Sequence, residues 1–139
     1  AYYSGGRTKD LQKATALLTK AAEQGHAMAQ ATLGVIYSEE NNVTKAVELW
    51  AKAAEQGHPI AIARLEEAAE GSNQRWATDA QASLGLSYYT GLGVRKDLRR
   101  AAELWMKAAN SSNADAQAHL DAMYANGEGV IPDERVPEV

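Results

Sequence analysis

The sequence predicts an all-α fold, a right-handed superhelix (solenoid) of about seven helices arranged as antiparallel pairs, with an irregular junction near residues 66–76. The first supporting observation is the heptapeptide KAAEQGH, which occurs at Lys20–His26 and again one repeat later at Lys52–His58. The second is a set of apolar residues at offsets of 3, 4, 7 and 8, the spacing of a helix with one buried face. The third is a shortage of alternating β-branched residues, which argues against strands.

Three aligned segments are predicted to form the second helix of each pair, and we name them the B helices: Asp10–Ala22, Lys45–Ala54 and Asp97–Ala109. Trp50 and Trp105 occupy the same core-facing position, where Leu18 stands in the first copy. Because this position recurs on the buried face, we predict that both tryptophans pack in the core and do not stack on a ligand. The B helices are expected to stop at glycines, at Gly25 and Gly57.

A second kind of segment alternates with the B helices, and we name these segments the A helices: Ala29–Tyr37, Ala80–Tyr88 and Ala116–Tyr124. Ala, Leu and Tyr recur in them at offsets of 0, 4 and 8 and therefore share one helical face. Gly34 and Gly85 lie beside that face and permit close backbone contact. The tyrosines Tyr37, Tyr88 and Tyr124 are expected to pack, with each hydroxyl reaching a partner at the rim.

The A and B helices are joined by a glycine-containing turn that is clearest at Tyr89–Asp97. Its first glycine can take the left-handed conformation that ends a helix, and Asp97 can cap the next helix by accepting from its free amides. The same turn is partly repeated at Asn126–Asp133, and we expect it in shortened form at Ser4–Asp10.

The combined pattern A-x-x-x-L-G-x-x-Y-x-x-G-x-G-V-x-x-D, followed by K-A-x-x-L-W-x-K-A-A-E-Q-G, strongly resembles the Sel1-like repeat, a relative of the tetratricopeptide repeat. Ala80–Asn113 carries the pattern almost in full, and Ala27–His58 carries it with Glu39–Asn42 in place of the Gly-x-Gly turn. The chain then divides into one domain with six parts: a partial repeat 1–26, a repeat 27–58, a truncated repeat 59–76, a repeat 77–113, a partial repeat 114–133 and a loose tail 134–139. Because Ala1–Gly5 matches the end of an A helix and no B helix follows Asp133, we expect the chain to come from a longer array.

The middle of the chain departs from the pattern. Pro59–Leu65 begins an A helix, yet Glu67–Gly71 already resembles the end of a B helix, so about one turn and one helix of the repeat are missing. We therefore expect a single helix over Pro59–Glu70 and a loop at Gly71–Gln74. Trp76 lies outside the pattern, and it is expected either to fill this junction or to sit exposed in a binding surface.

Composition and charge exclude several classes of function. The chain of 139 residues has no cysteine, which excludes disulfides and thiolate zinc sites and leaves the compartment open between a bacterial cytoplasm and a periplasm. A net charge of −4 argues against a nucleic-acid partner. No segment approaches the roughly 20 apolar residues of a membrane helix, so we predict no membrane insertion.

The sequence contains no recognisable catalytic, cofactor or metal motif, and we predict none of these sites. His26 and His58 lie one repeat apart at helix junctions and would not converge on a metal, which needs three or four ligands in one place. The Gly-x-Gly turns lack the trailing glycine and the preceding strand of a nucleotide-binding loop. No nucleophile motif of the Gly-x-Ser-x-Gly kind is present.

A stack of such repeats has a continuous inner wall that suits the binding of protein surfaces. The resemblance implies that the A helices line this wall. Taking Leu33 as the buried reference and turning about 100° per residue gives ten outward positions, which we name the A-helix ladder. They are Met28, Thr32, Val35, Arg64, Asp79, Ser83, Leu86, Asp115, His119 and Ala122. We predict a non-catalytic adaptor or scaffold, most simply a monomer, that binds another protein on this ladder.

Two alternatives follow from the resemblance. Some Sel1-like proteins act as immunity proteins that neutralise a cognate secreted bacterial toxin, and nothing in these residues separates that role from a signalling or envelope-assembly adaptor. Some cysteine-rich members are associated with β-lactams or peptidoglycan, which suggests an enzyme or a binder of those compounds. The paired cysteines of those members and a Ser-x-x-Lys motif are both absent from this sequence.

Overall fold

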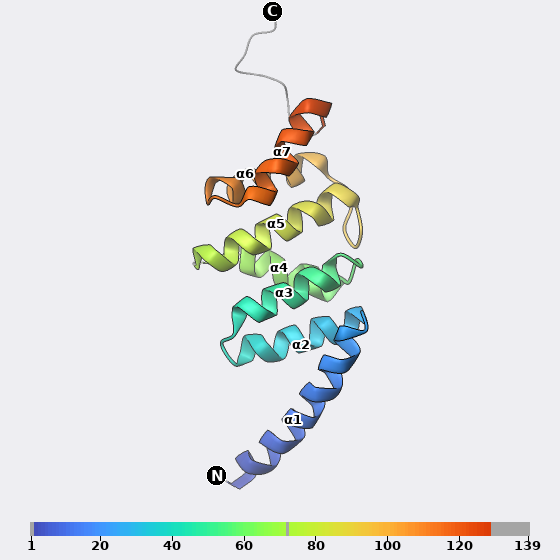
Figure 1. The fold of residues 1–139 in the computed structure, drawn as a ribbon, viewed down its shortest axis with the longest axis vertical. Helices are drawn as coiled ribbons and strands as arrows, with labels where there is room; N and C mark the ends of the chain where they lie inside the picture. Colours follow the sequence, from blue (N-terminus) through green and yellow to red (C-terminus); the bar gives the residue numbers. More distant parts are fainter. Residues whose placement is uncertain (1, 72, 129–139) are drawn as a thin grey trace, which may run out of the picture.

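The computed structural model describes residues 2–71 and 73–128, and over those residues it contains seven α-helices and no strand. The helices are α1 (Tyr2–Glu23), α2 (Ala27–Glu39), α3 (Val43–Ala54), α4 (Pro59–Ala69), α5 (Gln74–Thr90), α6 (Leu98–Asn110) and α7 (Ala114–Asn126). They stack in chain order, with α1 and α7 at opposite ends of the long axis (Figure 1). The predicted all-α stack of about seven helices is confirmed, and its right-handedness stays a prediction.

The α2–α3 and α5–α6 hairpins are the regular part of the stack. Gly91 has φ 78° and ends α5, and the Asp97 side chain accepts a hydrogen bond from the Arg100 backbone amide at 3.0 Å at the start of α6. Both predictions for this turn are confirmed. In the α2–α3 turn, where glycine is absent, Asn41 takes the left-handed conformation with φ 63°, and Asn42 caps α3. Asparagine tolerates this conformation better than most residues with a side chain.

A tryptophan–glycine pair closes each hairpin. Trp50 and Trp105 are 4% and 1% exposed, so their predicted packing is confirmed. Their indole Nε1 atoms donate to the carbonyl oxygens of Ala31 at 3.2 Å and Ala82 at 3.0 Å. A Cβ added at Gly34 or Gly85 would overlap the indole ring of the facing tryptophan. The two glycines therefore admit an indole ring, whereas we had expected them to admit a second backbone.

The other predicted helix stops and tyrosines fit with one exception. Gly25 and Gly57 have φ values of 90° and 81° in the turns that follow α1 and α3, which confirms both stops. Tyr37 and Tyr88 are half-buried against the core. Tyr124 differs, because it is 49% exposed and no described segment covers it.

The irregular junction contains a single short helix, α4, and the observed end of α4 and start of α5 each differ from the prediction by one residue. Glu70 lies just past α4, and Gln74 is already the first residue of α5. Gln81 Nε2 donates to the Ala69 carbonyl at 3.1 Å, as Gln30 Nε2 donates to the Ala22 carbonyl at 3.2 Å at the end of α1. The α4 helix thus begins in the position of an A helix and ends in the position of a B helix.

The turn predicted at Ser4–Asp10 is wrong, because α1 runs unbroken through it from Tyr2 to Glu23. Over these residues the backbone satisfies its own amides and carbonyls by continuing the helix, and the glycines that predicted a turn do not interrupt it. At the other end, Gly127 has φ 67° and ends α7. The rest of the turn predicted at Asn126–Asp133 and the tail 134–139 lie beyond the described residues.

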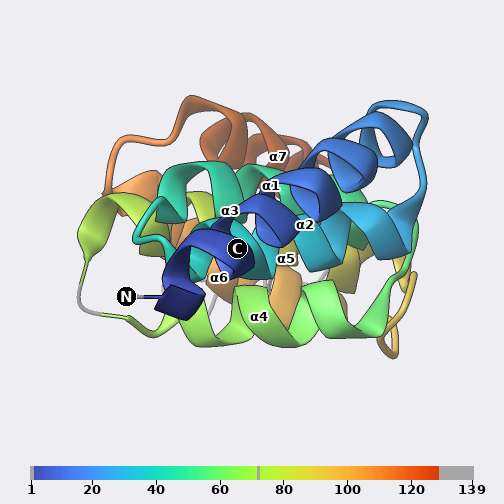
Figure 2. The same ribbon diagram turned by 90° about the horizontal axis from the view of Figure 1, so that it is seen from below.

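In the end-on view, α4 lies along one side of the molecule, and α3 and α7 lie towards the other (Figure 2). The α5 helix contacts both α3 and α4, so its neighbours include a helix that is not adjacent in sequence. None of the helices in the described part of the chain is long and apolar enough to span a membrane.

Candidate functional site

The A-helix ladder is largely accessible in the structure. Val35, Ser83 and Leu86 are half-buried. The exposed members are Met28, Thr32, Arg64, Asp79, Asp115, His119 and Ala122. Met28 is 69% exposed despite its apolar side chain. Because a helix buries apolar side chains where a neighbour is available, an exposed methionine on this row is compatible with a contact surface.

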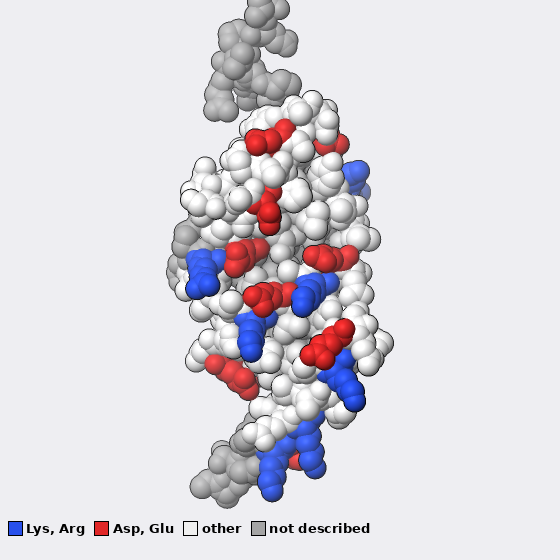
Figure 3. Space-filling view, in the orientation of Figure 1, with Lys and Arg blue, Asp and Glu red and all other residues white. Residues whose placement is uncertain are grey.

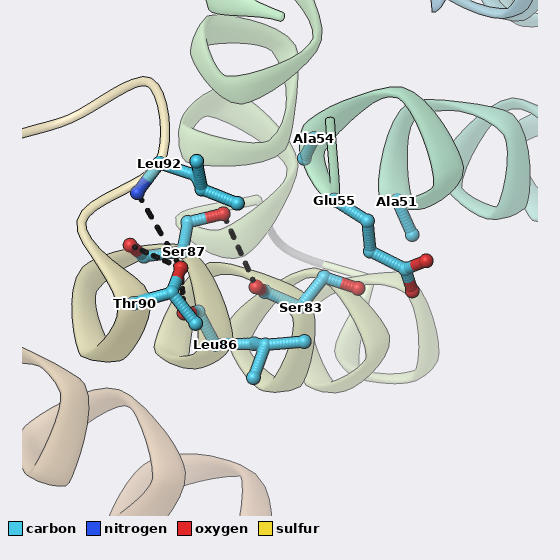
Figure 4. A pocket seen from close by; sticks show the side chains of 8 residues that line it. All are labelled: Ala51, Ala54, Glu55, Ser83, Leu86, Ser87, Thr90 and Leu92. Carbon is cyan, nitrogen blue, oxygen red and sulfur yellow. Dashed lines mark hydrogen bonds between the residues drawn. The ribbon is translucent and has the colours of Figure 1, made fainter. Parts of the chain in front are cut away.

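The structure brings Ser83 and Leu86 together in a pocket of about 80 Å³ between α3 and α5 (Figure 4). We name this the α5 pocket, and its other lining residues are Ala51, Ala54, Glu55, Ser87, Thr90 and Leu92. The Ser87 hydroxyl donates to the Ser83 carbonyl at 3.5 Å, and the Thr90 hydroxyl donates to the Leu86 carbonyl at 3.0 Å. The α5 pocket exists because α5 packs directly against the C-terminal end of α3.

A larger groove of about 340 Å³ lies along α4, on the helical face that corresponds to the pocket-lining face of α5. We name it the α4 groove. Its residues are Ser38, Val43, Trp50, Arg64, Glu67, Ala68, Gly71, Asn73 and Trp76. Aligning the buried Leu65 with the buried Leu84 places Arg64, Glu67, Ala68 and Gly71 where α5 has Ser83, Leu86, Ser87 and Thr90. The α4 groove and the α5 pocket therefore lie on corresponding faces of two successive helices.

Trp76 combines the two roles that the sequence left open. It is half-buried and packs against the central core cluster, and it also lines the α4 groove. The α5 helix begins at Gln74, and Trp76 stands in its first turn. The junction is filled by one part of this side chain while another part remains accessible.

His119 is held by a ring contact that the sequence did not predict. Its imidazole stacks on the Trp105 indole with centroids 4.4 Å apart and planes at 16°. Tyr89 lies on the same indole, with centroids 5.6 Å apart. Since Trp105 is buried and His119 is exposed, the imidazole forms part of the surface with a fixed orientation.

A third concavity of about 300 Å³ lies between α1, α2 and α3. Four charged side chains surround it, Glu23, Lys45, Glu48 and Lys52, over a floor that includes Leu33 and Leu49. The sequence did not predict this concavity, because we assigned the polar face of the B helices to the solvent-exposed surface. It also missed Glu55 and Glu67, although Glu67 stands in register with Val35 and Leu86 and could have been found by alignment.

Charged side chains also connect α4 to the α5–α6 hairpin. Glu66 accepts from the Tyr88 hydroxyl at 2.5 Å and lies 3.5 Å from Arg100. The Arg100 guanidinium lies 5.7 Å from the Tyr88 ring centroid, as Lys45 lies 5.2 Å from that of Tyr37. Burial, followed by the hydrogen bond to Glu66 and its charge, raises the pKa of Tyr88, and Arg100 partly opposes this.

The visible surface mixes both signs of charge. Acidic and basic side chains alternate over the middle of the face in Figure 3, around α2 to α5. At the α7 end, the Tyr89 hydroxyl donates to Glu128 at 2.9 Å, and this hydrogen bond is the main cause of a raised pKa for Tyr89. Interspersed charges favour specific pairing with one partner surface over general attraction to a polyanion.

The described residues hold no group of three or more His, Asp or Glu side chains that could bind a metal ion. His26 and His58 stand at the N-terminal ends of α2 and α4, which confirms that they lie at helix junctions. The Nδ1 atom of His58 is buried and has no hydrogen-bond partner among the described residues.

Comparison with known proteins gives a consistent picture. The family model described as "Sel1 repeat" matches residues 1–26, 27–58, 78–113 and 114–136. The chain is 32% identical over 131 residues to "ERAD-associated E3 ubiquitin-protein ligase component HRD3A" of Arabidopsis thaliana, an alignment that covers 94% of this chain and 18% of that protein. It is 30% identical over 113 residues to "DAP3-binding cell death enhancer 1" of Rattus norvegicus, covering 81% of this chain and 19% of that protein.

The chain thus spans less than a fifth of the length of these two relatives. Among solved structures, a Sel1 repeat protein from Oxalobacter formigenes is similar, with 30% identity and a TM-score of 0.40 over 86% of this chain and 57% of that one.

Proposed function

This chain belongs to the Sel1 repeat family, and from that membership we propose that it is a non-catalytic adaptor or scaffold that binds a partner protein on the A-helix ladder. Sel1 repeats generally mediate protein–protein interactions. The observation that carries the proposal is the repetition of a concavity on one helical face, as the α4 groove and the α5 pocket. Concavities in register along a stack can receive successive side chains of one partner surface.

The exposed apolar residues support the same face. Met28 and Ile60 are 69% and 53% exposed and occupy matching places near the starts of α2 and α4. Each is followed one helical turn later by an exposed polar residue of the ladder, Thr32 after Met28 and Arg64 after Ile60. Exposed apolar side chains beside polar ones are usual in protein–protein interfaces.

The names of the relatives are compatible with such a role. One is named as a component of a ubiquitin-protein ligase, and another is named for binding DAP3. Neutralisation of a secreted toxin is a special case of the proposal, since an immunity protein also needs a protein-binding face.

The proposal is tested by affinity capture with the whole chain, followed by mass spectrometry and measurement of the dissociation constant for the captured protein. Reversing the charge at one ladder position and truncating another, Arg64→Glu with His119→Ala, should weaken capture by about tenfold or more. The matched control, Lys107→Glu with Met106→Ala, changes an exposed cation and an exposed side chain on α6. It should leave capture unchanged.

Thermal melts followed by circular dichroism show whether both variants remain folded. This control is needed because His119→Ala also removes the ring stacking on Trp105. Loss of capture in the α6 control with normal capture in the ladder variant would show that the wrong face was chosen. Hydrolysis of a β-lactam or of peptidoglycan that one polar substitution abolishes would overturn the non-catalytic role.

A further inference from the structure

The α5 pocket has apolar walls and oxygen atoms at its edges (Figure 4). Ala51, Ala54, Leu86 and Leu92 supply the walls. The polar atoms are the Glu55 carboxylate and the hydroxyls of Ser83, Ser87 and Thr90. In Figure 4 the Glu55 carboxylate and the Ser83 hydroxyl lie towards the same side of the pocket. A ligand group for this site must therefore combine an apolar stem with a polar head.

The hydrogen bonds within the pocket show which kind of head fits. Ser87 and Thr90 already direct their hydroxyl hydrogens at carbonyls of α5, at 3.5 Å and 3.0 Å. Their oxygens, like those of the Glu55 carboxylate, can only accept from a ligand. Among the described residues, the Ser83 hydroxyl has no hydrogen-bond partner, and it can also accept. The pocket therefore favours a ligand group that donates hydrogen bonds. An ammonium group is such a group, with three donors and no acceptor.

The charge at the pocket has the same implication. Over residues 2–71 and 73–128, the ion pairs are Arg64–Glu67 and Arg100–Glu66, and Glu55 takes part in neither. The Glu55 carboxylate makes this edge of the pocket negative, which complements a cationic group.

The volume restricts the stem. The pocket holds about 80 Å³, whereas a cavity that takes a benzene ring measures roughly 150 Å³. Because Glu55 at the edge of the pocket is exposed, an unbranched chain of methylene groups can enter in part and keep its head in solvent, whereas a planar ring would have to enter whole. A lysine can lay its four-carbon stem along Leu86 and Leu92 while its head reaches water and the carboxylate. The planar guanidinium of arginine is broader than an ammonium group.

We propose that the α5 pocket binds a lysine side chain of the partner protein. This inference rests on the proposed function, because it names what one part of the A-helix ladder recognises. The stem contacts Leu86 and Leu92, and the ammonium group donates to the Glu55 carboxylate and the Ser83 hydroxyl oxygen. The α4 groove differs from it, since Arg64 stands there in the place of Ser83 and already pairs with Glu67, the carboxylate that lines that groove.

The test is a titration of the isotope-labelled 139-residue chain with three small probes, followed by amide chemical shifts in NMR spectra. The probes are the Nα-acetyl N-methylamides of lysine, norleucine and arginine. The lysine probe should move the amides around the pocket, on α3 near Glu55 and on α5 from Ser83 onwards. Norleucine, which keeps the stem without the charge, should bind several-fold more weakly, and added salt should weaken only the charged probes.

The repeated heptapeptide supplies a matched control. Glu55 and Glu23 occupy the same place in its two copies, but Glu23 lines the concavity between α1 and α3. Glu55→Gln should weaken the lysine probe by about fivefold, the upper range for an accessible ion pair. Glu23→Gln should change nothing at the α5 pocket.

Three results would overturn the proposal: no shift with the lysine probe, equal binding of norleucine, or tighter binding of arginine. An equal effect of the two glutamine variants would overturn it as well. These failures are distinct from a failure of the proposed function. If the ladder variant loses its captured protein while Glu55→Gln has no effect on either assay, the binding face stands and the lysine pocket does not.

Discussion

The α5–α6 hairpin and α4 start from the same A-helix pattern but differ at one position on the helix. In α5 that position is Gly85, and the Trp105 indole of α6 lies directly against it. In α4 the matching residue is Glu66, and the next helix is α5, another A helix, instead of a B helix with a tryptophan in the place of Trp105. Instead, its carboxylate accepts from Tyr88 and pairs with Arg100. Where the second helix of a repeat is missing, a charged side chain joins the short helix to its neighbours.

The end of the stack extends the comparison. The matching position in α7 is Asp121, which accepts from the Gln117 side chain at 2.9 Å and is exposed. Glycine therefore occurs at this position only in the two described A helices that pack against a tryptophan. The residue at this position therefore indicates whether an indole ring can pack against an A helix, because any Cβ there would occupy the space that the ring needs.

The largest expected effect comes from removing the aromatic side chain from the regular hairpin. Trp105→Ala should lower the free energy of unfolding by about 3–5 kcal/mol, because it leaves a cavity and removes the indole hydrogen bond to the Ala82 carbonyl. Urea denaturation followed by circular dichroism measures this. Trp76→Ala at the junction is the comparison, and it should cost less because Trp76 is only half-buried. Equal losses would contradict the distinction between the two regions.

A smaller loss is expected from adding one methyl group at the close contact. Gly85→Ala should destabilise the fold by about 1–3 kcal/mol through overpacking, although alanine favours a helix more than glycine does. Adding Trp105→Leu, which copies Leu18 of the first repeat, should remove the clash and make the alanine neutral or favourable in that background. Thermal melts of the four proteins in this double-mutant cycle measure the coupling.

The matched control for the glycine is Asp121→Ala, at the same position of α7. It should change the melting temperature little, because no indole ring faces it. If Gly85→Ala were as harmless as Asp121→Ala, the glycine–tryptophan contact would not be needed for the hairpin.

The smallest effect is expected at the junction. Glu66→Gln keeps the shape but removes the charge next to Tyr88 and Arg100, and it should lower the free energy of unfolding by about 1 kcal/mol or less. The Tyr88 phenol should then ionise at a lower pH than in the parent chain, since Glu66 is one cause of its raised pKa. Phenolate absorbance, with Tyr88→Phe as the reference, follows this titration.

The direction of the pH dependence follows from the same tyrosine. The pKa of Tyr88 in the folded chain lies above the unfolded value of 10.0, so the protonated phenol stabilises the fold. This contribution is fully present below pH 10.0 and is lost as the pH rises through the folded-state pKa. An unchanged Tyr88 titration in the Glu66→Gln variant would disprove the role of the carboxylate.

The features read correctly from the sequence are those encoded in a few neighbouring residues. The helix stops at Gly25 and Gly57, the cap at Asp97 and the burial of both tryptophans follow from local conformation and from apolar spacing. The turn predicted at Ser4–Asp10 is wrong for a related reason. Its glycines carry a turn signal, but a local signal of this kind does not exclude a continuous helix, and α1 runs through it.

The candidate site shows where such reasoning ends. The helical register gave Arg64, Ser83 and Leu86, which do line two concavities. It could not give Glu55 in the α5 pocket, because that residue directly follows the C-terminal end of α3, two helices earlier in the chain. Which helix ends meet there depends on α4 being short enough for α5 to reach α3.

The sequence by itself therefore determined the kind of helix at each place and which face of it is buried, since both depend on spacing along one chain segment. Only the tertiary structure decided how the shortened repeat is bridged and which side chains share a pocket. Those outcomes depend on contacts between helices that are not neighbours in sequence, where a shift of one turn changes every partner.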